Sequence, residues 1–278
     1  MPRLSRSKFG LKLKLFFTLF LLVSGTLFFT VFHYGFSPDL LTKLSFYINL
    51  ANPSVRIVRV EEGLRKEEVA EVVADRLGWD EKKKEDFINI HLALNTANQE
   101  GRYFPKTYLI GKDENPSGVG VAMFGEFSAQ VSKIKKPHSN NKSKQIINED
   151  TVVTIASLIQ REAAGKHDMK LISGIIWNRI WKGMKLQVDA TLQYAKGSEE
   201  EGWWKQVTKE DKKIKSYYNT YLYPGLPPGA IANPGLAAIE AAYNPQKTDC
   251  LFYLHDKNRK IHCSRTYEEH KKNIEIYY

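Results

Sequence analysis

Residues 15–38 contain no Asp, Glu, Lys or Arg, and this run of 24 residues constrains the chain more than any other feature. About 20 apolar residues are enough for a helix to cross the hydrocarbon core of a bilayer. Residues 1–14 carry five basic side chains and no acidic one, which predicts that the N-terminus stays on the cytoplasmic side. We therefore expect a cytoplasmic basic tail at 1–14, a single-pass transmembrane anchor at 15–38 and an extracytoplasmic remainder.

A cleaved signal peptide is the alternative for the same run, because Val23–Gly25 resembles a cleavage site. The apolar core of a signal peptide usually has only ~7–15 residues. The greater length of this run favours an uncleaved anchor.

The composition of the 278 residues, with 26% charged and 42% hydrophobic side chains, is that of a globular chain of one or two domains. The net charge of +10 would suit an anionic partner, but a solvated surface rich in Lys and Glu explains it more simply. No basic cluster with interleaved aromatic residues indicates nucleic-acid binding. Glycine-rich phosphate loops, the dinucleotide fingerprint and the Gly-x-Ser-x-Gly elbow are also missing from the sequence. We expect no nucleic-acid partner and no cofactor.

The two cysteines, Cys250 and Cys263, flank a predicted β-hairpin with its turn near Asp256–Arg259. A ladder centred on that turn places Cys250 nearer to Arg265 than to Cys263, so the register disfavours a disulfide, which remains the alternative. His255 and His262 lie in the same hairpin, but the spacing lacks the close ligand pairs of structural zinc sites. We expect no metal.

The remaining chain alternates short helices, strands and loops, which predicts an α+β fold. We expect a linker at 39–54, then a small subdomain with connecting elements at 55–131 and a larger mixed α/β domain at 132–278. The small subdomain begins with a strand at 55–63, a helix at 64–79 and a second helix at 80–97. Later elements are predicted as helices near 152–166, 168–181, 190–195 and 236–245, with an extended stretch between the second and third of these.

Glu162 interrupts the apolar face of the first of these later helices, which it shares with Ile155, Leu158 and Ile159. Burial disfavours a charged carboxylate, and a carboxylic acid that stays protonated near neutral pH can serve as a general acid. The simpler interpretation is a solvated residue at the end of a helix, paired with Lys166 one turn later.

Polar side chains follow in two further segments. Gln187, Asp189 and Thr191 lie in the extended stretch after Gly183, where Asp189 is also well placed to cap the next helix. Tyr218, Asn219 and Thr220 precede a loop rich in Pro and Gly at 224–235. Flat rings, amides and hydroxyls beside a rigid loop suit a sugar, although buried tyrosines in a structural loop would give the same pattern.

Four segments of the chain, "ASLIQRE", "NRIWKGMKLQVDATLQY", "YNTYLYPGLPPGAIANPG" and "AAYNPQKTDCLFYL", resemble in order and spacing the MltG, or YceG-like, family of endolytic murein transglycosylases. "EGRYFPKTYLI" resembles a further family element, and the similarity covers about residues 55–275. It implies a LysM-like subdomain after the anchor and a catalytic Glu at Glu162. The family's conserved polar residues carry over to Asn178, Arg179, Gln187, Asp189, Thr191, Tyr218, Asn219 and Thr220.

The resemblance implies cleavage of the β-1,4 bond between N-acetylmuramic acid and N-acetylglucosamine in nascent glycan strands, leaving 1,6-anhydro ends and terminating elongation. It also implies a bacterial inner-membrane location and peptidoglycan synthases as partners. The chain departs from the family where Gln160 replaces a frequent acid and where Lys271 follows His270 in place of Asn. The alternative function is a non-catalytic scaffold that binds the cell wall and its synthases.

Overall fold

The computed structural model describes residues 51–90, 99–136 and 148–277, together with scattered positions between 18 and 48. The chain divides into two compact units, Met1–Val55 and Arg56–Tyr278. The predicted tail and most of the predicted anchor lie outside the described residues, and no described helix is long and apolar enough to cross a bilayer. The anchor therefore stays a prediction.

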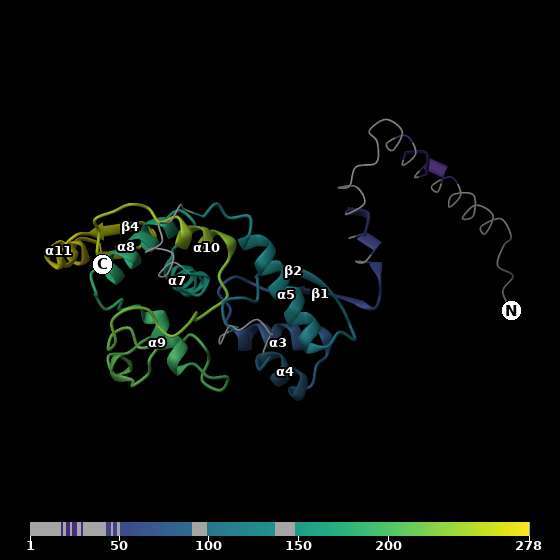
Figure 1. The fold of residues 1–278 in the computed structure, drawn as a ribbon, viewed down its shortest axis with the longest axis horizontal. Coiled ribbons are helices and arrows are strands. Elements are labelled where there is room, and N and C mark those ends of the chain that lie inside the picture. Colours follow the sequence, from purple (N-terminus) through teal and green to yellow (C-terminus); the bar gives the residue numbers. More distant parts are fainter. Residues whose placement is uncertain are drawn as a thin grey trace, which may run out of the picture. The chain divides into compact units, whose positions relative to one another are not determined.

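The first part of the second unit contains the predicted strand, helix and helix (Figure 1). β1 (Val55–Arg59) forms a two-stranded sheet with β2 (Thr107–Gly111), and α3 (Lys66–Leu77) packs against α4 (Glu81–Ile88). Asp80 caps α4 by accepting a hydrogen bond from the Lys83 N–H at 2.9 Å, as its position in the sequence indicates. α4 ends at Ile88, well before the predicted end at residue 97, and residues 91–98 lie outside the described range.

α5 (Pro116–Val131) is the longest of the described elements that the sequence pattern did not predict. Three glycines in this segment obscure its helical spacing, since glycine lowers helix propensity. The helix instead draws its stability from burial, because Val119, Met123, Phe127 and Val131 recur every four residues and are all buried. The first two belong to the hydrophobic cluster of the small region and the last two to the larger cluster, so α5 spans both.

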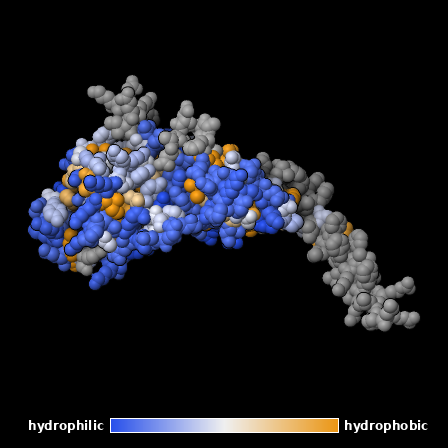
Figure 2. All heavy atoms as spheres, turned by 90° about the horizontal axis from the view of Figure 1, so that it is seen from below, coloured by the Kyte–Doolittle hydropathy of each residue, from blue (hydrophilic) through white to orange (hydrophobic). Residues whose placement is uncertain are grey.

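The larger part consists mainly of helices. α7 (Glu149–Glu162) packs against α8 (Met169–Trp181) and α10 (Leu236–Tyr243), and Ile155, Leu158 and Ile159 are completely buried between them. The remaining elements are α9 (Asp189–Lys196), the short 3₁₀ helix η1 (Asp211–Lys213), the hairpin of β3 (Phe252–His255) and β4 (Ile261–Ser264), and α11 (Tyr267–Tyr277). The mixed α/β content that the sequence predicts is confirmed. The face drawn in Figure 2 is mostly hydrophilic over the described residues.

A buried polar junction joins the small region to the larger one. Asn233, which is not exposed at all, donates from Nδ2 to Leu64 O at 3.0 Å and to Glu100 Oε1 at 3.1 Å, and its Oδ1 accepts from the Tyr103 N–H at 2.8 Å. Glu100 also accepts from the Lys66 N–H at the first turn of α3. Burial raises the pKa of Glu100 to about 8. The junction thus fixes the loop at 224–235 against the start of α3. The domain boundary predicted between residues 131 and 132 stays a prediction.

The hairpin corrects one expectation. β3 and β4 pair antiparallel with Tyr253 opposite Cys263, close to the predicted register. Cys250 and Cys263 are nevertheless joined in a disulfide, with their Cα atoms 5.8 Å apart. The prediction from the register was wrong because the ladder begins only at Phe252 and Cys250 precedes the strand. The register of the ladder therefore does not set the distance between the two cysteines.

Candidate active site

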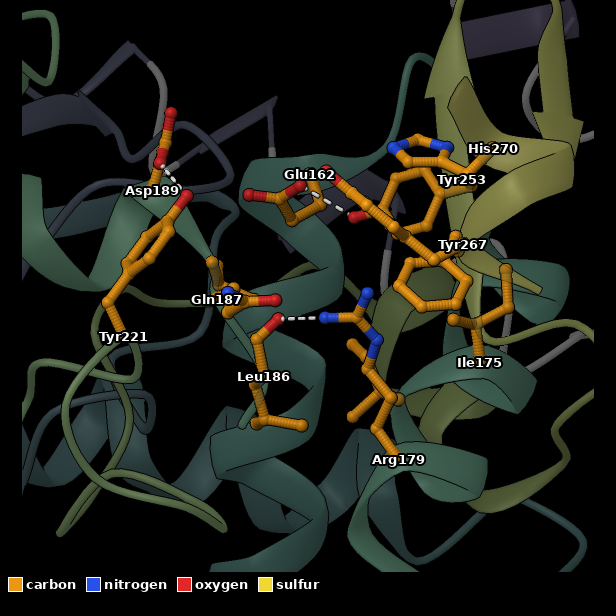
Figure 3. A pocket seen from close by; sticks show the side chains of 13 residues that line it. Glu162, Ile175, Arg179, Leu186, Gln187, Asp189, Tyr221, Tyr253, Tyr267 and His270 are labelled. Carbon is orange, nitrogen blue, oxygen red and sulfur yellow. Dashed lines mark hydrogen bonds between the residues drawn. The ribbon is translucent and has the colours of Figure 1, made fainter. Parts of the chain in front are cut away.

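A pocket of about 390 Å³ opens beside the C-terminal end of α7 (Figure 3). Its lining comes from α7, α8, the segment before α9, the loop after η1, the hairpin and α11. Thirteen residues line it: Glu162, Ile175, Ile176, Arg179, Leu186, Gln187, Val188, Asp189, Tyr221, Phe252, Tyr253, Tyr267 and His270. Of the nine predicted site residues, Glu162, Arg179, Gln187 and Asp189 are among them.

Glu162 is the last residue of α7, and its side chain meets the hairpin instead of Lys166. The Tyr253 hydroxyl donates to Glu162 Oε2 at 2.6 Å (Figure 3). Burial raises the pKa of Glu162 above its usual value, and the Tyr253 hydrogen bond opposes this rise. The negative end of the α7 dipole also disfavours a charge at this position. The site thus favours a protonated carboxylic acid at the pocket.

Asp189 is the second carboxylate of the pocket and accepts a hydrogen bond from the Tyr221 hydroxyl at 2.6 Å. Its charge raises the pKa of Glu162 further, while His255 and Arg161 lower it. Asp189 does not cap α9, because Val188 occupies the capping position and Asp189 is the first helical residue. Its carboxylate is therefore left to face the pocket.

Arg179 holds two walls of the pocket together. Its guanidinium donates to Leu251 O and to Leu186 O, each at 2.6 Å, and lies over the ring of Phe252. Burial lowers the pKa of Arg179. Arginine side chains keep their positive charge in proteins. Arg179 thus gives the pocket a fixed positive group.

Gln187 lies at the pocket with its side chain exposed and its backbone in the left-handed region, at φ 54°. This conformation is uncommon for a residue other than glycine and costs of order 1–3 kcal/mol. The Gln187 N–H donates to Thr220 O at 3.1 Å, which holds the backbone in place. The surrounding structure therefore maintains a strained residue whose amide faces the pocket (Figure 3).

The other five predicted residues support the pocket from outside its lining. Val188 N–H donates to the Thr220 hydroxyl at 3.0 Å, and the Thr220 and Thr191 hydroxyls are 3.0 Å apart. Asn219 is completely buried and bonds to the backbone of its own loop, and the ring of Tyr218 packs against Tyr194. These contacts hold the segment that carries Gln187 and Asp189.

Asn178 is also outside the lining. Its side chain donates to Thr248 O at 2.8 Å and to Cys250 O at 3.1 Å, which attaches the chain before β3 to α8.

The side chains of the hairpin and of α11 were not among the predicted site residues. Phe252 and Tyr253 come from β3, and Tyr267 and His270 from α11. Figure 3 shows Tyr253, Tyr267 and His270 at the pocket. His270 stacks on Phe252, and burial lowers its pKa. His270 Nδ1 is buried, and no described residue hydrogen bonds to it. Only the family pattern could have indicated His270, and Lys271 made that pattern inexact.

Asp168 and His255 form a pair next to Tyr253, with Asp168 buried and His255 half-buried. Asp168 accepts from the Ala164 N–H at 2.9 Å and the Gly165 N–H at 3.2 Å, and its Oδ2 lies 2.7 Å from His255 Nε2. The pair ties the turn after Glu162 to the strand that carries Tyr253. Within the described ranges, no group of three His, Cys, Asp or Glu side chains is arranged to hold a metal ion.

Comparisons with known proteins show the family of this chain. The model of the YceG-like family matches residues 33–276. An endolytic murein transglycosylase of Bacillus subtilis is 32% identical over 240 residues, 79% of this chain and 64% of the relative. One from Streptococcus pneumoniae is 35% identical over 179 residues, 63% of this chain and 31% of the relative.

This chain therefore spans less than two thirds of each of these relatives. A crystal structure of a YceG-like protein from Listeria monocytogenes superimposes with a TM-score of 0.65 at 27% identity, covering 84% of this chain and 80% of that one. A family match over most of the chain, together with the same fold, shows that the chain belongs to the YceG-like family.

Proposed function

We propose that this chain is an endolytic lytic transglycosylase that cleaves peptidoglycan glycan strands between N-acetylmuramic acid and N-acetylglucosamine. The observation that carries the proposal is the Glu162 carboxyl, placed at a pocket with a raised pKa and a hydrogen bond from Tyr253. The names of the curated relatives support the same activity.

In the proposed first step, protonated Glu162 gives its proton to the glycosidic oxygen as the bond from that oxygen to the anomeric carbon breaks. Tyr253 donates to Oε2, which leaves Oε1 to carry the proton. The transition state resembles an oxocarbenium ion, and Asp189 and the amide of Gln187 lie at the same pocket to meet it. General acid catalysis of this kind contributes typically ~10²–10⁴-fold.

In the second step, the Glu162 carboxylate accepts the proton of the muramic acid 6-hydroxyl while that oxygen bonds to the anomeric carbon. The products are a 1,6-anhydro end and a new 4-hydroxyl, and Glu162 is protonated again. No water is consumed. Six further residues remain proposed residues of the substrate site. Arg179 lines the pocket, and the other five act through the walls they hold: Asn178, Thr191, Tyr218, Asn219 and Thr220.

A hydrolase is the second candidate, because Asp189 places another carboxylate at the same pocket. Most glycosidases use two carboxyl groups, one as acid and one as base or nucleophile. Hydrolysis would leave reducing ends, whereas the proposed reaction leaves anhydro ends. The chemistry of the product therefore separates the two candidates.

The test is Glu162→Gln in the full-length chain, purified in detergent and incubated with glycan strands. We expect anhydro ends from the parent and a loss of at least ~10²-fold in the variant. Release of anhydro ends at the parental rate by Glu162→Gln would refute the role of Glu162. A parent that binds glycan but releases no product would instead support the non-catalytic scaffold.

We further propose that residues 15–38 anchor the chain in the cell membrane, with the tail at 1–14 in the cytoplasm and residues 56–278 outside. The length of the uncharged run and the basic flank support this orientation. The region at 55–131 is proposed to be LysM-like on the order of its elements. Synthases are proposed partners, since termination of strand growth requires access to the growing strand.

A further inference from the structure

α8 presents two opposite faces to two different cavities. Ile175, Ile176 and Arg179 line the candidate active site. Gly174, Trp177, Asn178 and Trp181, spaced i, i+3, i+4 and i+7, form a stripe on the other side of the helix and line a second cavity of about 520 Å³. This second cavity is called here the tryptophan cavity. Of its lining, the proposed function uses only Asn178, whose side chain holds the chain before β3.

The opposite wall of the tryptophan cavity is the segment at 242–248, which the structure holds rigidly against α8. A Cβ added at Gly174 would lie 2.2 Å from Gln246 O, so only glycine permits this close approach. The Gln246 N–H donates to Lys170 O at 2.9 Å, and Asn178 Nδ2 donates to Thr248 O at 2.8 Å. The cavity is therefore formed before any ligand arrives, which lowers the entropic cost of binding.

Two stacked indoles form one side of the cavity. Trp177 is buried, and its Nε1–H donates to Ala242 O at 3.2 Å. Trp181 stacks on it with ring centroids 5.7 Å apart and planes 18° apart, yet remains 56% exposed. The buried Trp177 thus holds Trp181 in a fixed orientation. The exposed face of Trp181 presents a large flat apolar surface to solvent.

The rim beside this surface is polar. Gln246 and Lys247 are exposed, and within the described part of the chain neither side chain makes a hydrogen bond or an ion pair. An amide can both donate to and accept from hydroxyl and acetamido groups, and an ammonium can pair with a carboxylate. A flat aromatic surface with a few polar groups at one edge is the chemistry that recognises a pyranose ring.

We propose that the tryptophan cavity binds an N-acetylated sugar of a peptidoglycan glycan strand, with the sugar ring stacked on Trp181 and its polar groups on Gln246 and Lys247. The inference rests on the proposed function for the identity of the glycan. Because the two cavities lie on opposite faces of α8, the sugar bound here belongs to a different stretch of glycan from the one being cleaved. A second contact of this kind raises the effective concentration of substrate at the active site.

The test uses the full-length chain in the Glu162→Gln background, so that binding is measured without turnover. Binding of peptide-free glycan strands and of a β-1,4-linked N-acetylglucosamine hexamer is compared for Trp181→Ala, Gln246→Ala and Tyr217→Ala. Tyr217 is a matched control, because it is another exposed aromatic residue, 79% exposed and outside both cavities. Tryptophan fluorescence adds a local readout, since no tryptophan lines the candidate active site.

We expect Trp181→Ala to bind glycan strands about tenfold more weakly, Gln246→Ala to show a smaller loss, and Tyr217→Ala to bind as the parent does. In the chain with Glu162 intact, Trp181→Ala should slow cleavage of long strands and leave cleavage of a tetrasaccharide unchanged. Unchanged glycan binding by Trp181→Ala, or an equal loss in Tyr217→Ala, would overturn the proposal. If the Glu162→Gln variant still cleaves glycan strands while its binding still depends on Trp181, this inference holds. Only the proposed role of Glu162 is then refuted.

Discussion

Replacing Tyr253 by Phe tests whether the pocket tunes Glu162 as proposed. The Tyr253 hydroxyl donates to Glu162 Oε2 and lowers the pKa of this carboxyl, against the larger effect of burial, which raises it. The variant keeps the ring and removes only this donor. The pKa of Glu162 must then rise, because the carboxylate loses a hydrogen bond that the neutral acid needs less.

The size of the shift follows from the strength of the lost bond. A hydrogen bond to a charged group contributes about 1.5–3 kcal/mol, and one pKa unit corresponds to about 1.4 kcal/mol. Glu162 is partly exposed, so solvent replaces some of the lost interaction and the lower end applies. We expect a rise of about one unit.

The assay is the pH dependence of kcat/KM for release of anhydro ends by the full-length chain. Glu162 must be protonated to act as an acid, so the alkaline limb of the profile should move upward by about one pH unit in Tyr253→Phe. Tyr221→Phe is the matched control, because it removes a hydroxyl bonded to Asp189 in the same pocket. An alkaline limb that stays in place or moves downward in Tyr253→Phe, or moves equally in Tyr221→Phe, would refute the reasoning.

Three further predictions concern stability, each measured by chemical denaturation. Replacing Cys250 and Cys263 by Ser should lower the free energy of unfolding by about 3 kcal/mol, as expected for a loop of this size, and an unchanged value would argue against the disulfide. Asn233→Ala should cost about 2–4 kcal/mol, because it strips buried partners from Glu100 and from the backbone; a loss below about 1 kcal/mol would contradict this. Glu100 has a folded pKa of about 8, above its unfolded value, so its protonated form favours folding and stability should fall as pH rises toward 8. Glu100→Gln should make the free energy of unfolding depend less on pH. The same pH dependence in the variant and the parent would contradict this prediction.

Four helices of the larger part, α7, α8, α9 and α10, could be predicted from the sequence because their signals are local. Asn148 caps α7 by accepting from the Thr151 N–H at 2.7 Å, and the apolar spacing after it matches the buried face. Turn residues likewise placed the hairpin. α5 was not predicted because its stability comes from burial against two hydrophobic clusters and not from helix propensity.

Within the candidate site, the sequence could identify Glu162 but not its partner. An acid on an apolar face is visible in the spacing alone, whereas Tyr253 lies 91 residues away along the chain. Gln187 was identified by residue type, but its left-handed backbone depends on Thr220 in another loop. Contacts between residues that are far apart along the chain produce no periodic pattern in the sequence.

The sequence by itself determined the uncharged N-terminal run, the order of most helices and strands, and the placement of one acid on an apolar helix face. The tertiary structure decided which side chains meet that acid, that Cys250 reaches Cys263, and that α8 faces two cavities. The physical reason is the range of the interactions. Propensity, capping and periodicity act within a few residues, whereas pKa shifts, disulfides and cavities arise from groups that only the packed chain brings together.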